Sequence, residues 1–369
     1  MPCMLPEYAA LWATVPGLQA DTSFSKRTEI IIFYFSEIYT QMIYQFQPIL
    51  KQTLWGGDKI APLKNIKDAP SNIGESWEIS GVENNISVVS HGPEKGLTLT
   101  QLIEKHGSDL LGKQNYERFG TEFPLLIKII DARQALSIQV HPNDETARLH
   151  GHSRGKTEMW YMLPSEPEAS MYVGLKHDLT PEKFMAMVND NTICDALVRY
   201  NVSAGDCFFL PAGRIHSIGA GCFLVEIQQT SDVTYRIYDF NRRDRNGNLR
   251  PLHVSLAADS IDYHARPDYK THYTLPDNGR AQLVDCPYFT TSLWTIRQNC
   301  LVDCSNLDSF MILICTSGNG SIIENGQHEY PVTMGDTLLL PATTKEVELR
   351  GDMQVIETHV GQGAVIQNA

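Results

Sequence analysis

Residues 135–144 read Ala-Leu-Ser-Ile-Gln-Val-His-Pro-Asn-Asp, and residues 155–161 read Gly-Lys-Thr-Glu-Met-Trp-Tyr. In the first stretch polar residues, Gln139 and His141 among them, alternate with apolar ones, which is the period of two that a β-strand requires. Gln139 and His141 therefore lie on the same face of one strand, with their side chains no more than about 7 Å apart. The second stretch begins another apolar run at Glu158.

An amide oxygen, an imidazole and a carboxylate on neighbouring strands form a mixed set of oxygen and nitrogen donors. Gln139, His141 and Glu158 supply these groups, and such a set suits a borderline divalent ion such as Zn²⁺. The alternative is that Gln139 and His141 form a hydrogen-bonded polar pair on a sheet face, which is the more frequent situation for two such residues alone. A metal site needs a second imidazole, and a later segment provides one at His216.

Residues 202–218 combine turn and strand signals in an order that returns the chain to the sheet. Gly205 begins a turn, an apolar strand follows, and Pro211 to Gly213 form a second turn that directs His216 back toward the sheet. The spacing Gly-x5-Pro-x-Gly-x2-His is more specific than any single histidine. In a small β-barrel such a hairpin can deliver the last metal ligand from a neighbouring strand. His216 therefore completes the predicted site.

Two basic residues lie within segments that have strand character. Lys128 is the single cation in the apolar run 123–130, where it either protects an edge strand or points inward near the metal strand. Both interpretations stay open from the residues alone. Arg236 lies in the alternating segment 225–240, whose inner polar face is predicted to include Glu226 as well. Because a buried guanidinium group requires a partner, Arg236 is a candidate functional residue.

An internal repeat near the C-terminus predicts a second β unit. Residues 334–341 (Met-Gly-Asp-Thr-Leu-Leu-Leu-Pro) repeat residues 204–211 (Ala-Gly-Asp-Cys-Phe-Phe-Leu-Pro) at the same spacing. In the second copy Thr343 stands where the first copy has a glycine, and Glu346 stands where the first has His216. Short alternating runs surround this copy. We therefore expect an all-β unit that lacks the ligands and serves as a structural element, a lid or a dimer surface.

A helical insertion is expected between the strands at about residues 178–200. Thr180 is a favourable N-cap, and Pro181 suits the first helical position. We expect the helix to continue, with or without a break, to Tyr200. Its Met and Phe side chains indicate core packing, so no chemistry is assigned to it.

The 369-residue chain has a formal net charge of −13 and eight cysteines. The acidic balance and the absence of any run rich in Lys and Arg argue against nucleic-acid and membrane-surface partners. A phosphate group would therefore have to be bound by local cations. The cysteines form no Cys-x-x-Cys pair, and several lie in apolar runs, as buried thiols do in a reducing compartment. This pattern favours the cytoplasm.

Residues 1–41 differ in character from the rest of the chain. They lack the basic segment, clean apolar segment and small-residue cleavage site of a signal peptide. The apolar run at residues 30–35 is too short to span a bilayer. Met42 then begins a natural first strand. We expect residues 1–41 to be a leader outside the family, with Met42 as the true start.

From Met42 onward the chain resembles the type I phosphomannose isomerases of the short bacterial form, which are metalloenzymes with a cupin fold. Only residues 1–41 depart from the family pattern, and the motifs together are highly specific. The motifs are Leu-Trp-Gly-Gly (54–57), Glu-Ser-Trp-Glu-Ile-Ser (75–80), Ser-Ile-Gln-Val-His-Pro-Asn (137–143), Gly-Lys-Thr-Glu-Met-Trp-Tyr (155–161), Leu-Pro-Ala-Gly-Arg-Ile-His (210–216) and Ser-Asp-Val-Thr-Tyr-Arg-Ile-Tyr-Asp (231–239).

This resemblance implies a mainly β fold of two cupin-type β-barrels, a bicupin, with a small helical insertion. It implies a catalytic cupin domain at residues 42–265 and a degenerate cupin-like β domain at residues 266–369. One Zn²⁺ per chain is implied, with the ligands Gln139, His141, Glu158 and His216. The implied catalytic residues are Arg236 and two lysines near the sugar phosphate or the reacting carbons, Lys128 and Lys156.

The implied reaction interconverts D-mannose 6-phosphate and D-fructose 6-phosphate through an enediol intermediate. One alternative is an isomerase of another hexose 6-phosphate, but the cupin isomerases of glucose 6-phosphate usually place more histidines in one motif. A second alternative is a non-catalytic metal-binding cupin that senses sugar phosphates, although such a binder would not need Arg236 beside the metal. The expected partner is a hexose 6-phosphate, and no sequence feature marks an interface between copies of the chain.

Overall fold

The structure is a computed structural model and describes residues 43–243, 246–326 and 328–361. The described residues belong to one compact unit that begins at Ile43. The expectations about the leader at residues 1–41 lie outside the described residues. No helix in the described ranges combines the length and the apolar character that crossing a bilayer would require.

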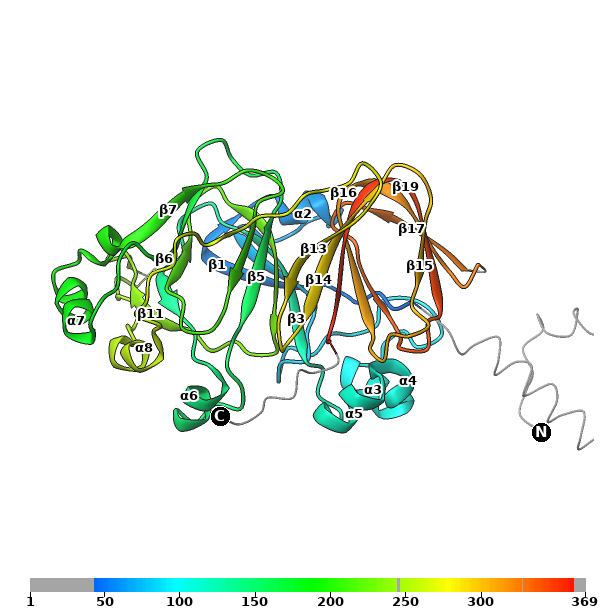
Figure 1. Cartoon of the computed structure of the whole chain (residues 1–369), viewed down its shortest axis with the longest axis horizontal. Helices are drawn as coiled ribbons and strands as arrows, with labels where there is room; N and C mark the ends of the chain where they lie inside the picture. The colour runs from blue at the N-terminus through cyan, green and yellow to red at the C-terminus, as the bar shows by residue number, and fades with distance from the viewer. Residues whose placement is uncertain (1–42, 244–245, 327, 362–369) are drawn as a thin grey trace, which may run out of the picture. The chain divides into compact units, whose positions relative to one another are not determined.

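Two antiparallel sheets make up the first half of this unit (Figure 1). The seven-stranded sheet has, in spatial order, β1 (Ile49–Gly57), β2 (Ile73–Ile79), β3 (Leu125–Asp131), β10 (Phe223–Gln229), β5 (Glu158–Met162), β8 (Cys207–Leu210) and β12 (Lys270–Thr271). The five-stranded sheet has β11 (Tyr235–Tyr238), β4 (Ile138–Val140), β9 (His216–Ile218), β6 (Ser170–Leu175) and β7 (Leu197–Asn201).

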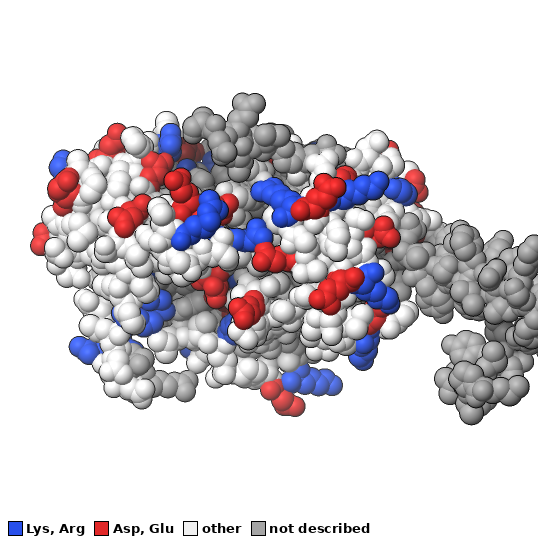
Figure 2. All heavy atoms as spheres, turned by 90° about the horizontal axis from the view of Figure 1, so that it is seen from below, with Lys and Arg blue, Asp and Glu red and all other residues white. Residues whose placement is uncertain are grey.

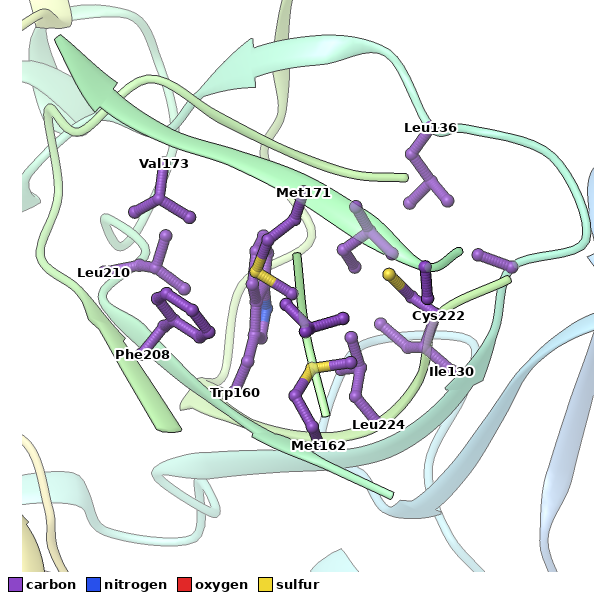
Figure 3. Packing of buried hydrophobic residues seen from close by; sticks show 14 of the residues in the cluster. Ile130, Leu136, Trp160, Met162, Met171, Val173, Phe208, Leu210, Cys222 and Leu224 are labelled. Atoms are coloured by element: carbon purple, nitrogen blue, oxygen red, sulfur yellow. The ribbon is translucent and has the colours of Figure 1, made fainter. Parts of the chain in front are cut away.

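An apolar core fills the space between these two sheets (Figure 3). Trp160 and Met162 come from β5, and Met171 and Val173 come from β6 on the opposite sheet. Complete burial of each large apolar side chain stabilises the fold by about 1.5–3 kcal/mol. Because side chains alternate along a strand, Glu158 points to the same face of β5 as Trp160 and Met162. The apolar pattern of β5 therefore directs a carboxylate toward the space between the sheets.

The mainly β class and the cupin-type architecture agree with the prediction, but the prediction of closed barrels is wrong. The described strands form separate sheets with free edges at β1 and β12, and at β11 and β7. Strands β4 and β9 are only three residues long, and β12 is only two. Such short strands cannot continue the hydrogen-bonded ladder around a complete circle, so the sheets face each other as in an open sandwich.

The C-terminal half contains a third, seven-stranded antiparallel sheet. Its apolar core includes Leu313, Leu338 and Val355. The repeated sequence places β18 in the second copy at the same positions as β8 in the first, as the repeat predicts. The sheet has β13 (Gly279–Asp285), β14 (Thr290–Ile296), β19 (Glu346–His359), β16 (Met311–Glu324) and β17 (His328–Thr333), with β15 (Cys300–Asp303) paired to β19 and β18 (Thr337–Leu340) paired to β16.

Short helices connect the strands (Figure 1). In α7 the predicted cap is confirmed, because the Thr180 side chain accepts a hydrogen bond from the backbone N–H of Lys183 and Pro181 opens the helix. The prediction of helix up to Tyr200 is wrong. The helices are α2 (Ile60–Leu63), α3 (Leu99–His106), α4 (Ser108–Leu111), α5 (Lys113–Phe119), α6 (Asp144–Leu149), α7 (Pro181–Asn189), the 3₁₀ helix η3 (Ile193–Ala196) and α8 (Val254–Ser260).

The end of the predicted insertion forms strand β7 because its residues alternate. Val198 and Tyr200 pack against the apolar core, Arg199 and Asn201 are exposed, and β7 pairs with β6. This period of two places the apolar residues against the core and the polar ones in solvent, which a helix over the same residues would not do. The turn from α7 into β7 contains Asn191 in the left-handed conformation, with φ at 59°.

Candidate metal centre

Two imidazoles and one carboxylate come together between the two facing sheets. His141 directly follows β4, Glu158 begins β5, and His216 begins β9. Their nearest ligand atoms all lie within 4.8 Å of one another, and all three residues are buried. Nε2 of His141 lies 3.6 Å from Oε2 of Glu158, and Nε2 of His216 lies 3.4 Å from Oε1. The described ranges contain no other such cluster of His, Cys, Asp and Glu side chains.

Backbone carbonyl groups orient both imidazoles toward the carboxylate. Nδ1 of His141 lies 2.7 Å from the carbonyl oxygen of Val233, and Nδ1 of His216 lies 2.8 Å from that of Arg214. These contacts place the ring proton on Nδ1 and leave the Nε2 lone pair facing Glu158. Burial lowers the pKa of His141 and lowers the pKa of His216 to about 4, so both rings stay neutral, as metal ligands must.

The Glu158 carboxylate tests whether these residues fit a cation. Both of its oxygens are fully buried, and neither accepts a hydrogen bond of good geometry from any described residue. The nearest positive group is the Lys156 ammonium, 2.6 Å from Oε2. Burial, and then the Glu226 carboxylate, raise the pKa of Glu158. A buried carboxylate that faces two neutral imidazole nitrogens is a donor set suited to Zn²⁺. The residues therefore fit the ion.

Gln139, the remaining predicted ligand, lies beside this cluster on β4. It is the register partner of His216 on β9 and of Arg236 on β11. Its Nε2 lies 3.3 Å from Nε2 of His216, and its Oε1 accepts a hydrogen bond from the Ser137 hydroxyl at 3.3 Å. The two ends of an amide differ only by rotation, and the opposite rotamer turns Oε1 toward the imidazoles. Gln139 is thus placed to bring an oxygen near the cluster.

A buried carboxylate, Glu226, joins the two predicted lysines. Oε1 of Glu226 lies 3.0 Å from Nζ of Lys128 and 3.6 Å from Nζ of Lys156. Although burial alone would raise the pKa of Glu226, the two ammonium groups lower it to about 2. Likewise, burial would lower the pKa of Lys128, but Glu226 and then Glu75 raise it. The site therefore holds fixed charges of both signs in a buried space.

The position of Lys128 decides between the two interpretations of that residue. Lys128 lies on β3, which is paired on one side with β2 and on the other with β10. A residue on such a central strand cannot protect a sheet edge. The inward interpretation is therefore correct, and the edge-strand interpretation is wrong.

Arg236 lies on β11 in register with Gln139 on β4, and its side chain is held by the segment before α8. Its Nη1 donates a hydrogen bond to the carbonyl oxygen of Pro251 at 2.8 Å, and its backbone N–H donates to Nδ1 of His253 at 3.1 Å. Its Nε is buried and has no hydrogen-bond partner among the described residues. None of the ion pairs in the described ranges joins Arg236 to Glu158 or Glu226. The guanidinium group thus retains a free donor.

Glu226 is the residue whose importance the sequence understated. The alternating pattern predicted it on an inner polar face but did not distinguish it from its neighbours. On β10 it lies in register with Lys128 on β3 and with Trp160 on β5, and its Oε2 accepts a hydrogen bond from Nε1 of Trp160 at 2.9 Å. The same Trp160 ring meets the His216 ring edge-on at 5.2 Å. Strand order was the missing signal, because it alone brings these residues together.

Comparisons with known proteins agree with this arrangement. The family model described as "Phosphomannose isomerase type I, catalytic domain" matches residues 43–183, and "Mannose-6-phosphate isomerase, cupin domain" matches residues 280–360. The chain is 35% identical over 318 residues to mannose-6-phosphate isomerase ManA of Bacillus subtilis, which covers 85% of this chain and 98% of that protein. The chain belongs to the type I phosphomannose isomerase family.

Further proteins named mannose-6-phosphate isomerase match the same region of the chain. A mannose-6-phosphate isomerase of Streptococcus mutans is 34% identical over 316 residues, covering 85% of this chain and 96% of that protein. The crystal structure of the mannose 6-phosphate isomerase from Bacillus subtilis matches with a TM-score of 0.78 at 28% identity. That match covers 87% of this chain and all of that one. The chain that carries this candidate metal cluster therefore shares the fold of that isomerase over nearly its whole described length.

Proposed function

We propose that this chain interconverts D-mannose 6-phosphate and D-fructose 6-phosphate, using one Zn²⁺ per chain and an enediol intermediate. The observation that carries the proposal is the Glu158 carboxylate, which faces two neutral imidazole nitrogens in a buried space. Beside it lie a lysine ammonium and a second carboxylate, Glu226. Family membership supports the same reaction, because the similar proteins of Bacillus subtilis and Streptococcus mutans are named mannose-6-phosphate isomerases.

The reaction moves two protons, and the substrate and the product have the same chemical composition. In the direction from aldose to ketose, the proton on C2 leaves and the carbonyl oxygen O1 is protonated, which forms the enediol. The proton on O2 then leaves while C1 is protonated, which forms the ketose. Negative charge develops on O1 in the first step and on O2 in the second, so the site must stabilise charge at both oxygens. A bound zinc ion supplies Lewis-acid stabilisation of that charge.

The chain's own residues can share this work. Gln139, His141, Glu158 and His216 would hold the ion. Arg236 has a buried Nε without a partner, and this donor is available for a developing negative charge on the substrate. Nζ of Lys156 lies 2.6 Å from Oε2 of Glu158 and 3.6 Å from Oε1 of Glu226. Lys156 is therefore placed to exchange protons with the substrate, and Glu226 is the neighbouring group that can accept a proton from it.

The substrate phosphate would be bound by local cations. The net charge is −13, and on the face seen in Figure 2 acidic and basic side chains are interspersed rather than separated by sign. Such a surface does not steer an anion by its overall field. Lys128 stays an ammonium ion because two carboxylates raise its pKa, so it can act as a fixed positive charge near the substrate.

We further propose the division of the chain that the resemblance implies. Residues 42–265 would form the catalytic cupin domain, with α7 and η3 as its helical insertion, and residues 266–369 would form a second cupin-like domain without ligands. The match of a cupin-domain model to residues 280–360 supports this bicupin arrangement. We also place the protein in the cytoplasm, because the free thiols of Cys207, Cys222 and Cys315 are buried in apolar surroundings that suit a reducing compartment.

The experiment is a coupled assay for fructose 6-phosphate formed from mannose 6-phosphate by the full chain, with and without a chelator. Turnover that the chelator abolishes and Zn²⁺ restores would support both the reaction and the metal. Parallel assays with glucose 6-phosphate test the first alternative. Binding of mannose 6-phosphate by folded, zinc-loaded protein that shows no turnover would favour the non-catalytic sensor and overturn the proposal.

A further inference from the structure

The segment that carries Lys156 has its backbone fixed from several directions. The N–H of Gly155 donates to Oδ1 of Asp144 at 2.8 Å, and the N–H of Lys156 donates to the carbonyl oxygen of Pro142 at 3.0 Å. The N–H of Thr157 donates to Oε1 of Gln229 at 2.8 Å, while the backbone N–H of Gln229 donates back to the carbonyl oxygen of Thr157 at 3.1 Å. Three successive backbone N–H groups thus have defined partners.

Close packing restrains the same segment. A Cβ atom on Gly155 would lie 2.4 Å from the carbonyl carbon of Asn143 and 2.6 Å from the carbonyl oxygen of Pro142. Real Cβ atoms do not approach backbone atoms so closely, so only glycine permits this contact. The chain after His141 and the chain before Glu158 therefore lie directly against each other. Their relative position sets where the two ligands and Lys156 stand.

Asp144 is the centre of this arrangement. Besides the N–H of Gly155, its Oδ1 accepts a hydrogen bond from Nε2 of Gln229 at 3.1 Å. Its Oδ2 accepts a hydrogen bond from the hydroxyl of Tyr288 at 3.3 Å. Burial, and then Asp144, raise the pKa of Tyr288 to about 12, so this hydroxyl stays protonated and remains a donor.

Tyr288 does not belong to the two sheets that surround the metal centre. It lies in the turn between β13 and β14 of the third sheet, 144 residues further along the chain than Asp144. One carboxylate therefore connects the Lys156 segment, the end of β10 at Gln229 and the C-terminal sheet. A connection of this kind gives the C-terminal half a part in the site, although the described part of that half has no metal cluster of its own.

We propose that Asp144, together with Gln229 and Tyr288, positions Lys156 for the isomerisation, and that the C-terminal sheet acts on the site through Tyr288. These three are positioning residues, since none of them belongs to the metal cluster or to the buried ion-pair group of Glu226, Lys128 and Lys156. The inference rests on the proposed function for its kinetic part. Its structural part, the restraint of residues 155–157, does not depend on the reaction.

The test compares Asp144→Asn and Tyr288→Phe with two matched controls. Glu145→Gln removes a charge from the same first turn of α6, on an exposed side chain. Tyr161→Phe removes a comparable hydrogen bond to the third sheet, from the Tyr161 hydroxyl to Oε1 of Gln354 at 3.4 Å. Tyr161 lies toward the end of β5 that is away from Glu158. For each zinc-loaded variant, kcat and KM for mannose 6-phosphate and amide hydrogen exchange of residues 155–157 are measured.

We expect Asp144→Asn, which replaces a charged acceptor of three hydrogen bonds by a neutral amide, to lower kcat by about tenfold. We expect Tyr288→Phe, which removes one hydrogen bond, to lower kcat by about threefold, with KM within about twofold in both variants. Exchange at residues 155–157 should be faster in both variants and unchanged in both controls. A kcat that stays at the parent value, or that falls equally in the controls, would overturn the inference. Unchanged exchange in Asp144→Asn would overturn it as well.

The two proposals fail in different ways. If the zinc-loaded parent does not turn over mannose 6-phosphate, the proposed function is wrong, and the exchange measurement still decides whether Asp144 and Tyr288 restrain the Lys156 segment. If the parent is active and the exchange rates do not change, the reaction stands and the positioning network is wrong.

Discussion

The ammonium nitrogen of Lys156 lies 2.6 Å from Oε2 of Glu158, the only carboxylate of the metal cluster. The same carboxylate therefore faces a cationic side chain and two neutral imidazoles. Burial, and then Glu226, raise the pKa of Glu158 to about 7, and the Lys156 ammonium acts in the opposite direction by favouring the ionised carboxylate. A divalent ion held by these residues would add two positive charges next to Lys156. The two carboxylates Glu158 and Glu226 would offset two of these three positive charges.

Glu158→Gln should remove metal binding with little change in shape. The variant keeps one oxygen donor but loses the negative charge, so we expect zinc affinity to fall by about 100-fold or more. Zinc content after dialysis and competition with a chromogenic chelator measure this directly. Turnover should fall with the metal content and return in part at high zinc concentration.

Glu226→Gln is the matched control, because it neutralises the other buried carboxylate of the same charged group. We expect this variant to retain zinc within about threefold of the parent affinity while losing most of its turnover, since Glu226 contacts both lysines but does not belong to the metal cluster. Equal loss of zinc in both variants would contradict the assignment of Glu158 as the ligand.

Arg236→Lys should separate charge from geometry at the substrate. Lysine keeps the positive charge but cannot reproduce a planar group that donates to Pro251 through Nη1 and still offers Nε. We expect kcat to fall by about 100-fold, the scale of a lost donor to a developing oxyanion, with zinc affinity unchanged. Steady-state kinetics with zinc analysis of the same sample provide the measurement. A variant with full activity would show that charge alone suffices.

The sequence could predict the local parts of the site because each of them follows from a short-range rule. Alternation placed Gln139 and His141 on one face of a strand, and turn spacing directed His216 back toward the sheet. The structure places one ligand atom each of His141, Glu158 and His216 within 4.8 Å of the other two. The cap of α7 at Thr180 follows the same kind of local rule.

The remaining features depend on strand order, which one sequence does not state. Lys128 was ambiguous until β3 was found between β2 and β10. Glu226 became central only because β10 brings it opposite both Lys128 and Trp160. The contact of Tyr288 with Asp144 joins residues 144 positions apart, and no local pattern marks it. Whether the sheets close into barrels also depends on hydrogen bonding between strands of two or three residues, which are too short to be predicted reliably from alternation.

Lys128→Met should destabilise the protein by leaving Glu226 without its nearest cation. Breaking a buried ion pair by removing one partner costs about 3 kcal/mol or more, because the remaining charge is desolvated. Lys156, 3.6 Å away, compensates in part. Urea unfolding of the metal-free protein measures the free energy of unfolding.

The double variant Lys128→Met with Glu226→Gln completes a thermodynamic cycle. Because it removes both charges, we expect it to be more stable than Lys128→Met alone, with a coupling of about 1–3 kcal/mol. Independent effects that simply add would show that the 3.0 Å contact between Lys128 and Glu226 contributes no specific interaction.

The stability of the protein in acid should depend on Asp239, which lies just beyond β11. Burial alone would raise its pKa, but hydrogen bonds from Arg250 and Arg242 hold the pKa below its ordinary value of 3.8. Arg250 donates from Nε to Oδ2 at 2.7 Å, and Arg242 pairs with Oδ1. A carboxyl whose pKa is lower in the folded state stabilises that state above about pH 4 and loses this contribution as the pH falls through the lowered pKa.

Asp239→Asn should therefore be less stable than the parent at pH 7, and the difference should narrow as the pH falls below about 4, where the parent loses the same interaction. Urea midpoints of chelator-treated protein at pH 7, 5, 4 and 3 measure this without a contribution from metal release. Asp58→Asn, on an exposed side chain, is the control and should change stability by less than about 0.5 kcal/mol at each pH. A difference for Asp239→Asn that stays constant from pH 7 to pH 3 would mean that the two arginines do not stabilise the ionised carboxylate, and that this end of β11 is held by packing alone.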